Sequence, residues 1–286
     1  GRSGVAVMDY CAHQLVATGY FHNHARMWFA AFWVHTCRLP WQLGAKFFMQ
    51  HLWDGDAASN TLSWRWVAGL HTLGKTYLAR QSNIERYLDS EILENHYPGI
   101  EQLADNKVEP APVPEIDPPV RQDYQPLPES YQLGDEKWGI WLHDDDLEIG
   151  TSPLAELKPD AVAVSPAWEG FHAAGISRAR ETFLMTVIAD GGRRAAMHWG
   201  QPTACNADQP LAHFLSSWAQ EHGLKKVVCL KPFVGPTLDA YASLEAALGE
   251  LGIELIALRR PFDNEILPLA RAGFFGFWKK AEKKLT

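Results

Sequence analysis

The stretch Thr18-Gly19-Tyr20-Phe21-His22-Asn23-His24-Ala25-Arg26-Met27 is followed by a second stretch of similar character, Asp54-Gly55-Asp56-Ala57-Ala58-Ser59-Asn60-Thr61-Leu62-Ser63-Trp64-Arg65-Trp66. Both combine amide or carboxylate groups with arginine and large aromatic rings. Taken singly, Asp54-Gly55-Asp56 is typical of a turn and Asn23 of a helix cap. Their occurrence together, in this order, favours a shared binding site over two unrelated local features.

The residues around these stretches are predicted to be helical. Apolar residues recur at helical spacing, and no alternating strand pattern occurs between residues 5 and 97. Gly19 and Pro40 interrupt the pattern and are expected to separate helices. The predicted helices are Ala6 to Thr18, His22 to Cys37, Leu43 to Leu52 and Asn83 to Glu94.

Together the two stretches resemble the photolyase/cryptochrome family. They are similar to its TGW-MHN-R-RM helix and its DGD-x-A-x-N-x-x-x-W-x-W run, and the resemblance covers residues 1–95. In the family this is the C-terminal portion of an all-helical FAD-binding domain, so the resemblance implies a blue-light flavoprotein.

The first residues resemble an internal segment of longer family members. The pattern Gly1-x-Ser3-Gly4-x-x-x-Met8-Asp9 is similar to the family's GxTGxPxVD segment. The chain is therefore expected to be a fragment that lacks the family's Ser/Thr-rich loop for the FAD diphosphate. The upstream half of the FAD domain, or an associated chain, is the expected partner that would supply this loop.

The resemblance implies a set of cofactor-binding residues. They are Asn23, Arg26, Asp54, Asp56 and Asn60, at positions beside the isoalloxazine or adenine group. An arginine near the flavin ring favours its anionic reduced form, and a carboxylate holds that arginine by a charge-assisted hydrogen bond. Asn60 corresponds to the residue that faces the reactive ring nitrogen, where an amide can donate or accept a hydrogen bond.

The resemblance also implies an electron path. Trp64 and Trp41 correspond to two tryptophans of the family's electron-transfer chain, with Trp64 nearer the flavin; the outermost member lies upstream of this sequence. Asn60, Trp64 and Trp41 are therefore the predicted catalytic residues.

A substrate surface is implied as well. The predicted substrate-binding residues are Asn23, His24, Met27 and Trp66, with Met27 and Trp66 contacting a flipped pyrimidine dimer. Ordinary core packing is the alternative for Met27 and Trp66. His24 replaces the family's common arginine and Tyr20 its common tryptophan, and both departures weaken the case for cyclobutane-dimer specificity.

Residues 98–135 are predicted to be a Pro-rich, acidic linker between a helical domain (1–97) and a second domain (136–286). Residues 101–160 carry a net charge of −11 against −8 for the whole chain, so the flanking parts are near neutral. The overall charge argues against a protein that coats DNA uniformly and leaves open a local basic face. The prolines that disfavour regular structure are Pro98, Pro110, Pro112, Pro114, Pro118, Pro119, Pro126 and Pro128.

Beyond the linker, short apolar strands alternate with helices, which predicts a parallel-sheet α/β sandwich. Gly223 and Gly252 stand where helix C-caps are expected. The predicted strands are Trp138 to His143, Ala161 to Ser165, Ala195 to Trp199, Lys226 to Leu230 and Ile253 to Leu258. The predicted helices are Arg178 to Ala189, Pro210 to His222, Thr237 to Leu251 and Ile266 to Lys283.

No ligand of this second domain follows from the sequence. Gly191-Gly192-Arg193-Arg194 is expected to follow a helix rather than open one, so it is not a dinucleotide fingerprint. His143-Asp144-Asp145-Asp146 could hold a divalent metal, but an acidic turn is the favoured interpretation and no metal is predicted. In architecture alone the domain resembles the family's α/β antenna domain, which would allow a second chromophore of unknown kind.

The remaining features suit a cytoplasmic protein. Four scattered cysteines form no CxxC pair, and no uncharged apolar run reaches eighteen residues, so neither zinc, nor disulfides, nor a membrane partner is expected.

The leading hypothesis is a deoxyribodipyrimidine photo-lyase that binds damaged DNA and FAD. The alternatives are a cryptochrome-like photoreceptor without repair activity and a degenerate relative whose helical part is only structural.

Overall fold

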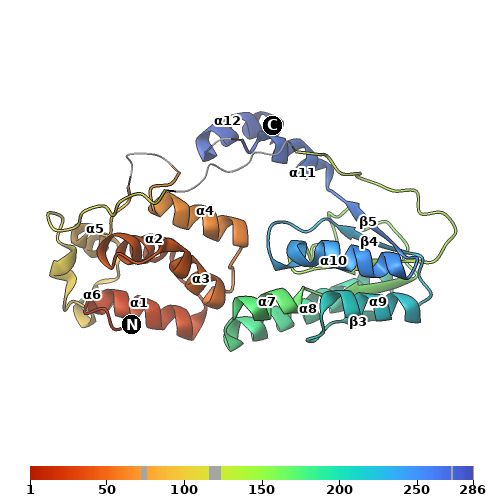
Figure 1. The fold of residues 1–286 in the computed structure, drawn as a ribbon, viewed down its shortest axis with the longest axis horizontal. Helices are drawn as coiled ribbons and strands as arrows, with labels where there is room; N and C mark the ends of the chain where they lie inside the picture. Colours follow the sequence, from red (N-terminus) through yellow and green to blue (C-terminus); the bar gives the residue numbers. More distant parts are fainter. Residues whose placement is uncertain (72–75, 116–123, 272, 286) are drawn as a thin grey trace. The chain divides into compact units, whose positions relative to one another are not determined.

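The computed structural model describes residues 1–71, 76–115, 124–271 and 273–285. It forms two compact units, Gly1–Asp117 with His172–Leu184, and Pro118–Phe171 with Met185–Thr286. The N-terminal region is helical, and a five-stranded parallel-sheet α/β domain follows it, as the element labels of Figure 1 show. This confirms the predicted fold class. Pro118 and Pro119 of the predicted linker lie outside the described residues.

The helical region begins with two helices that the predicted break at Gly19 separates. Gly19 adopts the left-handed conformation (φ 67°) after the first helix, and His22 caps the second by accepting from the backbone N–H of His24. The elements in order are α1 (Ala6–Thr18), α2 (Asn23–Ala31), the π-helical turn η1 (Phe32–Thr36), α3 (Trp41–His51), α4 (Ala57–Val67), α5 (Gln81–Tyr87), α6 (Ser90–Asn95) and the 3₁₀ turn η2 (Ile100–Leu103).

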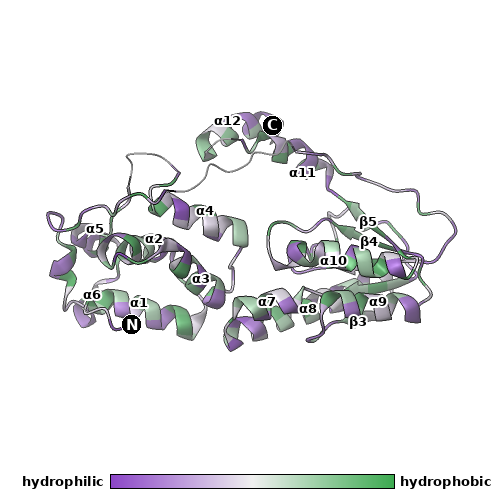
Figure 2. Cartoon of the chain, viewed as in Figure 1, coloured by the Kyte–Doolittle hydropathy of each residue, from purple (hydrophilic) through white to green (hydrophobic). Residues whose placement is uncertain are grey.

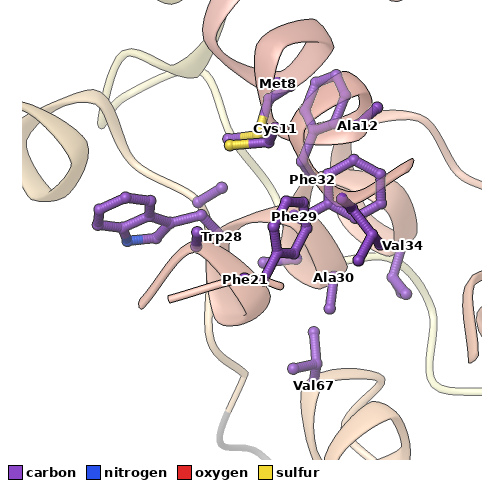
Figure 3. Close-up of a cluster of buried hydrophobic side chains, with 14 of the residues drawn as sticks. Met8, Cys11, Ala12, Phe21, Trp28, Phe29, Ala30, Phe32, Val34 and Val67 are labelled. Carbon is purple, nitrogen blue, oxygen red and sulfur yellow. The ribbon is translucent and has the colours of Figure 1, made fainter. Parts of the chain in front are cut away.

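An aromatic core holds these helices together. Figure 3 shows side chains of α1, α2, η1 and α4 gathered in one cluster. The Phe21 and Phe48 rings meet edge to face with centroids 5.7 Å apart, and Phe48 meets Trp64 in the same way at 5.0 Å. Edge-to-face pairs stabilise a core beyond the burial of their area, so the aromatic residues fix how α2, α3 and α4 pack.

Two predicted helices differ from the structure. The helix predicted over His22 to Cys37 ends as a π-helical turn, in which Cys37 N–H donates to Phe32 O five residues back. The helix predicted over Asn83 to Glu94 is two helices, because the Asp89 side chain accepts from the N–H groups of Glu91 and Ile92 and so caps a new helix.

The beginning of the predicted linker packs into the helical core. Ile100 and Leu103 are fully buried there, and Ala6 N–H donates to Pro98 O at 2.9 Å. Pro98 precedes the 3₁₀ turn, so its missing N–H removes no helical hydrogen bond. Residues 98–103 are thus structured rather than extended.

The η1 turn places a buried histidine in a defined protonation state. His35 Nε2–H donates to Val67 O at 2.9 Å, and its Nδ1 accepts from Ala111 N–H at 2.9 Å. Since a backbone N–H can only donate, the ring is neutral with its proton on Nε2. Burial is the main reason why the pKa of His35 lies below its usual 6.5.

This histidine predicts acid sensitivity. As the pH falls below about 6.5 the unfolded chain takes up a proton on residue 35 before the folded chain does, so the free energy of unfolding decreases. Above about 6.5 neither state binds that proton and the contribution is complete. Urea unfolding between pH 5 and 8 should show this loss, and His35→Gln should have a shallower slope over pH 5 to 6.5. Equal slopes for the unchanged protein and His35→Gln would contradict the neutral state assigned to His35.

The second unit is built on five parallel strands in the order β3-β2-β1-β4-β5. Register pairs such as Gly139 with Ala161 and Val228 with Ile256 align the strands. The strands are β1 (Trp138–Leu142), β2 (Ala161–Val164), β3 (Thr203–Cys205), β4 (Lys226–Leu230) and β5 (Glu254–Leu258). The helices after β1 are α7 (Trp168–Ala174), α8 (Arg178–Trp199), α9 (Leu211–Glu221), α10 (Pro236–Glu250), α11 (Pro261–Ile266) and α12 (Phe274–Leu285), with a 3₁₀ turn η3 (Leu267–Leu269). Residues 172–184, the end of α7 and the start of α8, belong to the first unit.

Alternate strand residues face two separate cores. Trp141 and Val227 lie with Leu215 of α9 and Leu244 of α10, whereas Ile140 and other strand residues of the opposite face lie with Ile188 of α8. Helices α9 and α10 carry hydrophobic and hydrophilic residues side by side in Figure 2, as amphipathic helices on a sheet do. Gly223 and Gly252 follow these helices in the left-handed conformation (φ 66° and 68°), as predicted.

The strand predicted over Ala195 to Trp199 is wrong, because these residues continue α8. Gly191 and Gly192 do not end the helix; they allow it to approach its neighbours. A Cβ at Gly192 would overlap the Cys205 sulfur of β3, and one at Gly191 would lie 2.9 Å from the Leu147 side chain. The strand of this region is Thr203–Cys205, which the sequence pattern did not predict because it is only three residues long.

The helix predicted over Ile266 to Lys283 is also wrong in its continuity. It is divided into the end of α11, the turn η3 and α12. Pro268 lies inside η3 and Gly273 precedes α12, and both residues disfavour a continuous helix. Ala272 lies outside the described residues. Within the described residues, no helix has the length and apolar character needed to span a membrane.

Candidate functional site

Helices α2, α3 and α4 and the loop before α4 surround a cavity of about 360 Å³. Its walls join polar side chains to a patch of aromatic and aliphatic ones. The lining residues are Asn23, Arg26, Met27, Ala30, Phe48, Leu52, Asp54, Gly55, Asp56, Ser59, Asn60, Ser63, Trp64, Trp66 and Val67. The predicted residues Asn23, Arg26, Met27, Asp54, Asp56, Asn60, Trp64 and Trp66 all belong to this set.

Arg26 supplies the positive charge of the cavity. Its Nη2 donates to both carboxylate oxygens of Asp54, at 3.0 and 2.9 Å, and its Nε donates to Phe21 O at 3.0 Å. Charge-assisted bonds of this kind are stronger than neutral ones. The guanidinium is therefore held in one orientation at the cavity wall.

Asp56 and Asn60 lie one turn apart on α4. The Asp56 carboxylate accepts from Ser59 N–H at 2.6 Å and so caps the helix. Asn60, only 8% exposed, donates its side-chain amide to Ala45 O at 2.8 Å. That bond fixes the rotamer of Asn60 before any ligand arrives.

Trp64 and Trp66 form the aromatic side of the site. Trp64 is 1% exposed, and its ring lies so close to Gly44 that a Cβ there would overlap it. Trp66 is 37% exposed, so its ring is available from solvent. An aromatic surface facing polar groups suits a flat heterocycle with hydrogen-bonding edges.

Two predicted residues do not line the cavity. His24 stacks on Tyr87 with ring centroids 4.7 Å apart, and on Trp28 at 5.9 Å. Trp41 packs against the core from α3, and its buried Nε1–H has no hydrogen-bond partner in the described part of the structure.

Sequence reasoning missed several lining residues. Ser59, Ser63 and Val67 share a face of α4 with Asp56 and Asn60, so helical spacing from the predicted residues would have found them. Arg180 does not line the cavity but bonds to Gly55, which does, and no sequence signal links the two residues. It is 3% exposed, belongs to the same compact unit, and donates to Gly55 O at 2.8 Å.

The acidic run after β1, Asp144 to Asp146, bonds to residues that follow β4 and β5. Thr237 Oγ1–H donates to Asp144 at 2.7 Å, Phe233 N–H donates to Asp145 at 2.9 Å, and Arg260 pairs with Asp146. His143 Nε2–H donates to Leu230 O, and burial lowers its pKa. No group of metal-ligating side chains that could hold an ion occurs among residues 1–71, 76–115, 124–271 and 273–285.

A second cavity, of about 410 Å³, lies in the α/β unit. Thr203 at the start of β3 and Glu221 and His222 at the end of α9 line it, so it is not at the carboxyl ends of the strands where α/β sheets usually bind ligands.

Comparisons with known proteins concern the helical region. Residues 1–108 match the family model of the FAD binding domain of DNA photolyase. The deoxyribodipyrimidine photo-lyase of Streptomyces griseus is 43% identical over 72 residues, which are 25% of this chain and 16% of that protein. The Escherichia coli enzyme of the same name is 38% identical over 77 residues, 27% and 16% of the two chains.

Cryptochromes match the same region. Cryptochrome DASH of Idiomarina loihiensis is 36% identical over 86 residues, 30% of this chain and 19% of that protein. The matches thus cover under a fifth of the length of these relatives. No solved structure matches the chain. Residues 1–108 are therefore similar to the FAD binding domain of DNA photolyase, and the similarity extends to photolyases and cryptochromes alike.

Proposed function

We propose that the cavity between α2, α3 and α4 binds the ring of FAD and that the protein is a light-driven DNA repair enzyme of the deoxyribodipyrimidine photo-lyase type, acting in the cytoplasm. The observation that carries the proposal is the cavity itself, which gathers the amides, carboxylates and arginine expected for FAD beside two tryptophans. Four free cysteines suit a reducing compartment.

The residues present fit the ring of a flavin. The cavity volume is at the small end of the ~300–1,000 Å³ of ligand sites, which suits part of a dinucleotide rather than all of it. FAD would supply light absorption and electron transfer to a pyrimidine dimer. Arg26, oriented by Asp54, would stabilise negative charge beside the ring, and Asn60 would bond to its edge.

The solvent exposure of Trp66 indicates which side of the cavity would receive the substrate. Met27 and Trp66 line the cavity, and Trp66 is open to solvent, so a flipped base could stack on its ring. Asn23 lies in the same wall. For the α/β unit, a second light-absorbing cofactor stays a proposal without a residue assignment.

A cryptochrome-like photoreceptor is the second candidate, and one contact favours it. His24 stacks on Tyr87 and Trp28 instead of lining the cavity, so one predicted substrate residue is already engaged. In that case FAD would bind without repair. A helical region that is only structural is the third candidate, and it requires that no flavin binds.

Repair is tested with a duplex that holds one thymine dimer, in blue light and in the dark, using the protein at its full natural length. We expect light-dependent repair. Trp66→Ala should weaken binding of the lesion by roughly 5- to 150-fold, from a stacking energy of about 1–3 kcal/mol, while FAD uptake stays unchanged. Tyr97→Ala removes an exposed aromatic ring outside the cavity and serves as the control. Flavin binding without any repair would favour the photoreceptor.

A further inference from the structure

We propose that helix α12 docks the protein on an anionic lipid surface and lies there in the plane of the membrane. Exposed aromatic rings at the start of the helix enter the lipid, and its lysines stay among the headgroups. The proposal goes beyond the proposed function and needs no flavin. A helix that lies on a membrane does not need the length of one that spans it.

The first observation is a cluster of exposed aromatic rings in the first turn of α12. Phe274 is 65% exposed, Phe275 86% and Trp278 42%. The Phe274 ring stacks on Trp278 with centroids 6.1 Å apart and meets Phe275 edge to face at 5.6 Å. The rings therefore form one continuous apolar surface. Scattered exposed apolar residues are ordinary, whereas a contiguous patch marks an interaction site.

The second observation is the charge that accompanies the rings. Helix α12 holds four lysines and one acidic residue, Glu282, which gives it a net charge of +3. The whole chain carries −8, so α12 is a local positive region on an acidic protein. The lysines, all exposed, are Lys279, Lys280, Lys283 and Lys284.

Helical spacing separates the rings from the lysines. At roughly 100° per residue, the three rings fall in an arc of about 100° and the four lysines in a separate arc of about 140°. Figure 2 shows hydrophobic and hydrophilic residues side by side on α12. Helices with aromatic residues on one face and lysines on the other are typical of segments that lie in a membrane interface. Lysine side chains also reach headgroups while their hydrocarbon portions stay in apolar surroundings.

The second half of α12 packs on the protein, which leaves the first turn to face solvent. Ala281 is 2% exposed, and Lys284 Nζ lies 3.5 Å from a carboxylate oxygen of Glu265 in α11. Glu282 lies one turn beyond Trp278, so the acidic residue follows the aromatic turn. The helix is thus fixed at one end and presents its rings at the other.

The rings favour a lipid surface over a nucleic acid as the partner. The lysines alone would attract the phosphate groups of either. A duplex bound by the lysine arc would leave Phe275, the most exposed of the three rings, in water. A lipid surface accommodates both features, because its acyl boundary receives the rings and its anionic headgroups attract the lysines. The cytoplasmic leaflet is rich in such anionic lipids.

Sedimentation with vesicles tests the docking, using the protein at its full natural length. One set of vesicles contains phosphatidylglycerol and phosphatidylcholine in equal parts, and the other contains phosphatidylcholine alone. We expect binding to the mixed vesicles that is stronger by roughly a hundredfold than binding to phosphatidylcholine. Added salt should weaken it, because the attraction between the lysines and the headgroups is screened.

Substitution of one ring tests the apolar contribution. Phe275→Ser should weaken binding to the mixed vesicles by roughly tenfold, because one large apolar side chain no longer leaves water. Phe275 is the most exposed of the three rings, so its loss does not disturb the core. Met197→Ser removes an apolar side chain of α8 that is 78% exposed, and this control should bind as the unchanged protein does.

Charge reversal tests the electrostatic contribution. Lys279→Glu combined with Lys283→Glu should abolish the preference for the mixed vesicles. The matched control reverses Lys158 and Lys225, which are exposed lysines outside α12. It changes the net charge of the protein by the same amount and should keep the preference.

A second readout shows whether α12 itself meets the lipid. Phosphatidylcholine brominated on its acyl chains quenches a tryptophan only at short range, so in mixed vesicles it should quench Trp278. Trp278→Phe keeps an aromatic ring and should bind with similar affinity, but this part of the quenching should disappear. Bound protein with equal quenching in both forms would show that another surface faces the lipid, and it would overturn the proposal.

The remaining outcomes name the other occupants of this helix. Absence of binding to the mixed vesicles overturns lipid docking, as does binding that reversal of Lys279 and Lys283 leaves unchanged. Binding of a short DNA duplex in place of vesicles, lost on that reversal, would assign the lysines to nucleic acid instead. A dimer in solution that Phe275→Ser dissociates would assign the rings to a second copy of the chain. FAD uptake should be equal in all these variants, so failure of lipid docking leaves the proposed function untouched.

Discussion

Arg26→Ala is expected to weaken FAD binding by roughly tenfold to a hundredfold without unfolding the protein. Arg26 lines the cavity and is held by Asp54 and by Phe21 O, so its truncation removes the one positive charge among the described lining side chains. Hydrogen bonds to charged groups contribute about 1.5–3 kcal/mol, which sets this range. The dissociation constant follows from titration of FAD fluorescence.

Arg26→Lys sharpens this test. A lysine keeps the charge but cannot reproduce the planar geometry with which a guanidinium pairs with a carboxylate, so an intermediate affinity is expected. Arg80→Ala is the matched control, since Arg80 is exposed and does not line the cavity. If Arg26→Ala bound FAD as tightly as Arg80→Ala, the cavity would not be the flavin site.

Gly99→Ala is expected to destabilise the helical unit by roughly 2–5 kcal/mol. Gly99 has φ 85°, and a Cβ there would overlap the backbone carbonyl oxygen of Gly4. Backbone atoms cannot move aside as a flexible side chain can. The contact joins residues 98–103 to the start of α1, so its disruption also loosens Ile100 from the core.

Gly4→Ala is a closely matched control. Gly4 has φ 82°, but the atom nearest to a methyl group added there would be the end of the Gln102 side chain, at 3.9 Å. Only the left-handed backbone is then strained, at a cost of about 1 kcal/mol. Urea unfolding followed by tryptophan fluorescence compares the two variants. Equal losses of stability would show that the backbone overlap does not matter.

The helical part of the fold and most of the candidate site follow from local signals. Asp54 to Trp66 place a cap, an amide and two indoles on one helix, so helical spacing brings them to one wall. Arg26 reaches Asp54 from another helix, which spacing alone cannot show, and there the family resemblance supplied the link. The domain borders at residues 97 and 135 stay a prediction.

What sequence reasoning could not find depends on tertiary contacts. Local sequence rules predict that Gly191 and Gly192 interrupt a helix. Both lie inside α8 instead, where the absence of a side chain lets β3 and Leu147 come close. Arg180 lies far from Gly55 in the sequence. Trp33 looks like any apolar residue of a helix in the sequence, yet its ring meets Trp64 edge to face with centroids 6.3 Å apart.

The central claim is that the helical region holds a photoactive flavin, and the absorption spectrum tests it most directly. The protein at its full natural length is mixed with FAD, freed of excess cofactor, and measured before and after blue light. The proposed function predicts a structured flavin band that bleaches on illumination. A protein that stays colourless after exposure to FAD would contradict it, and the helical region would then be structural.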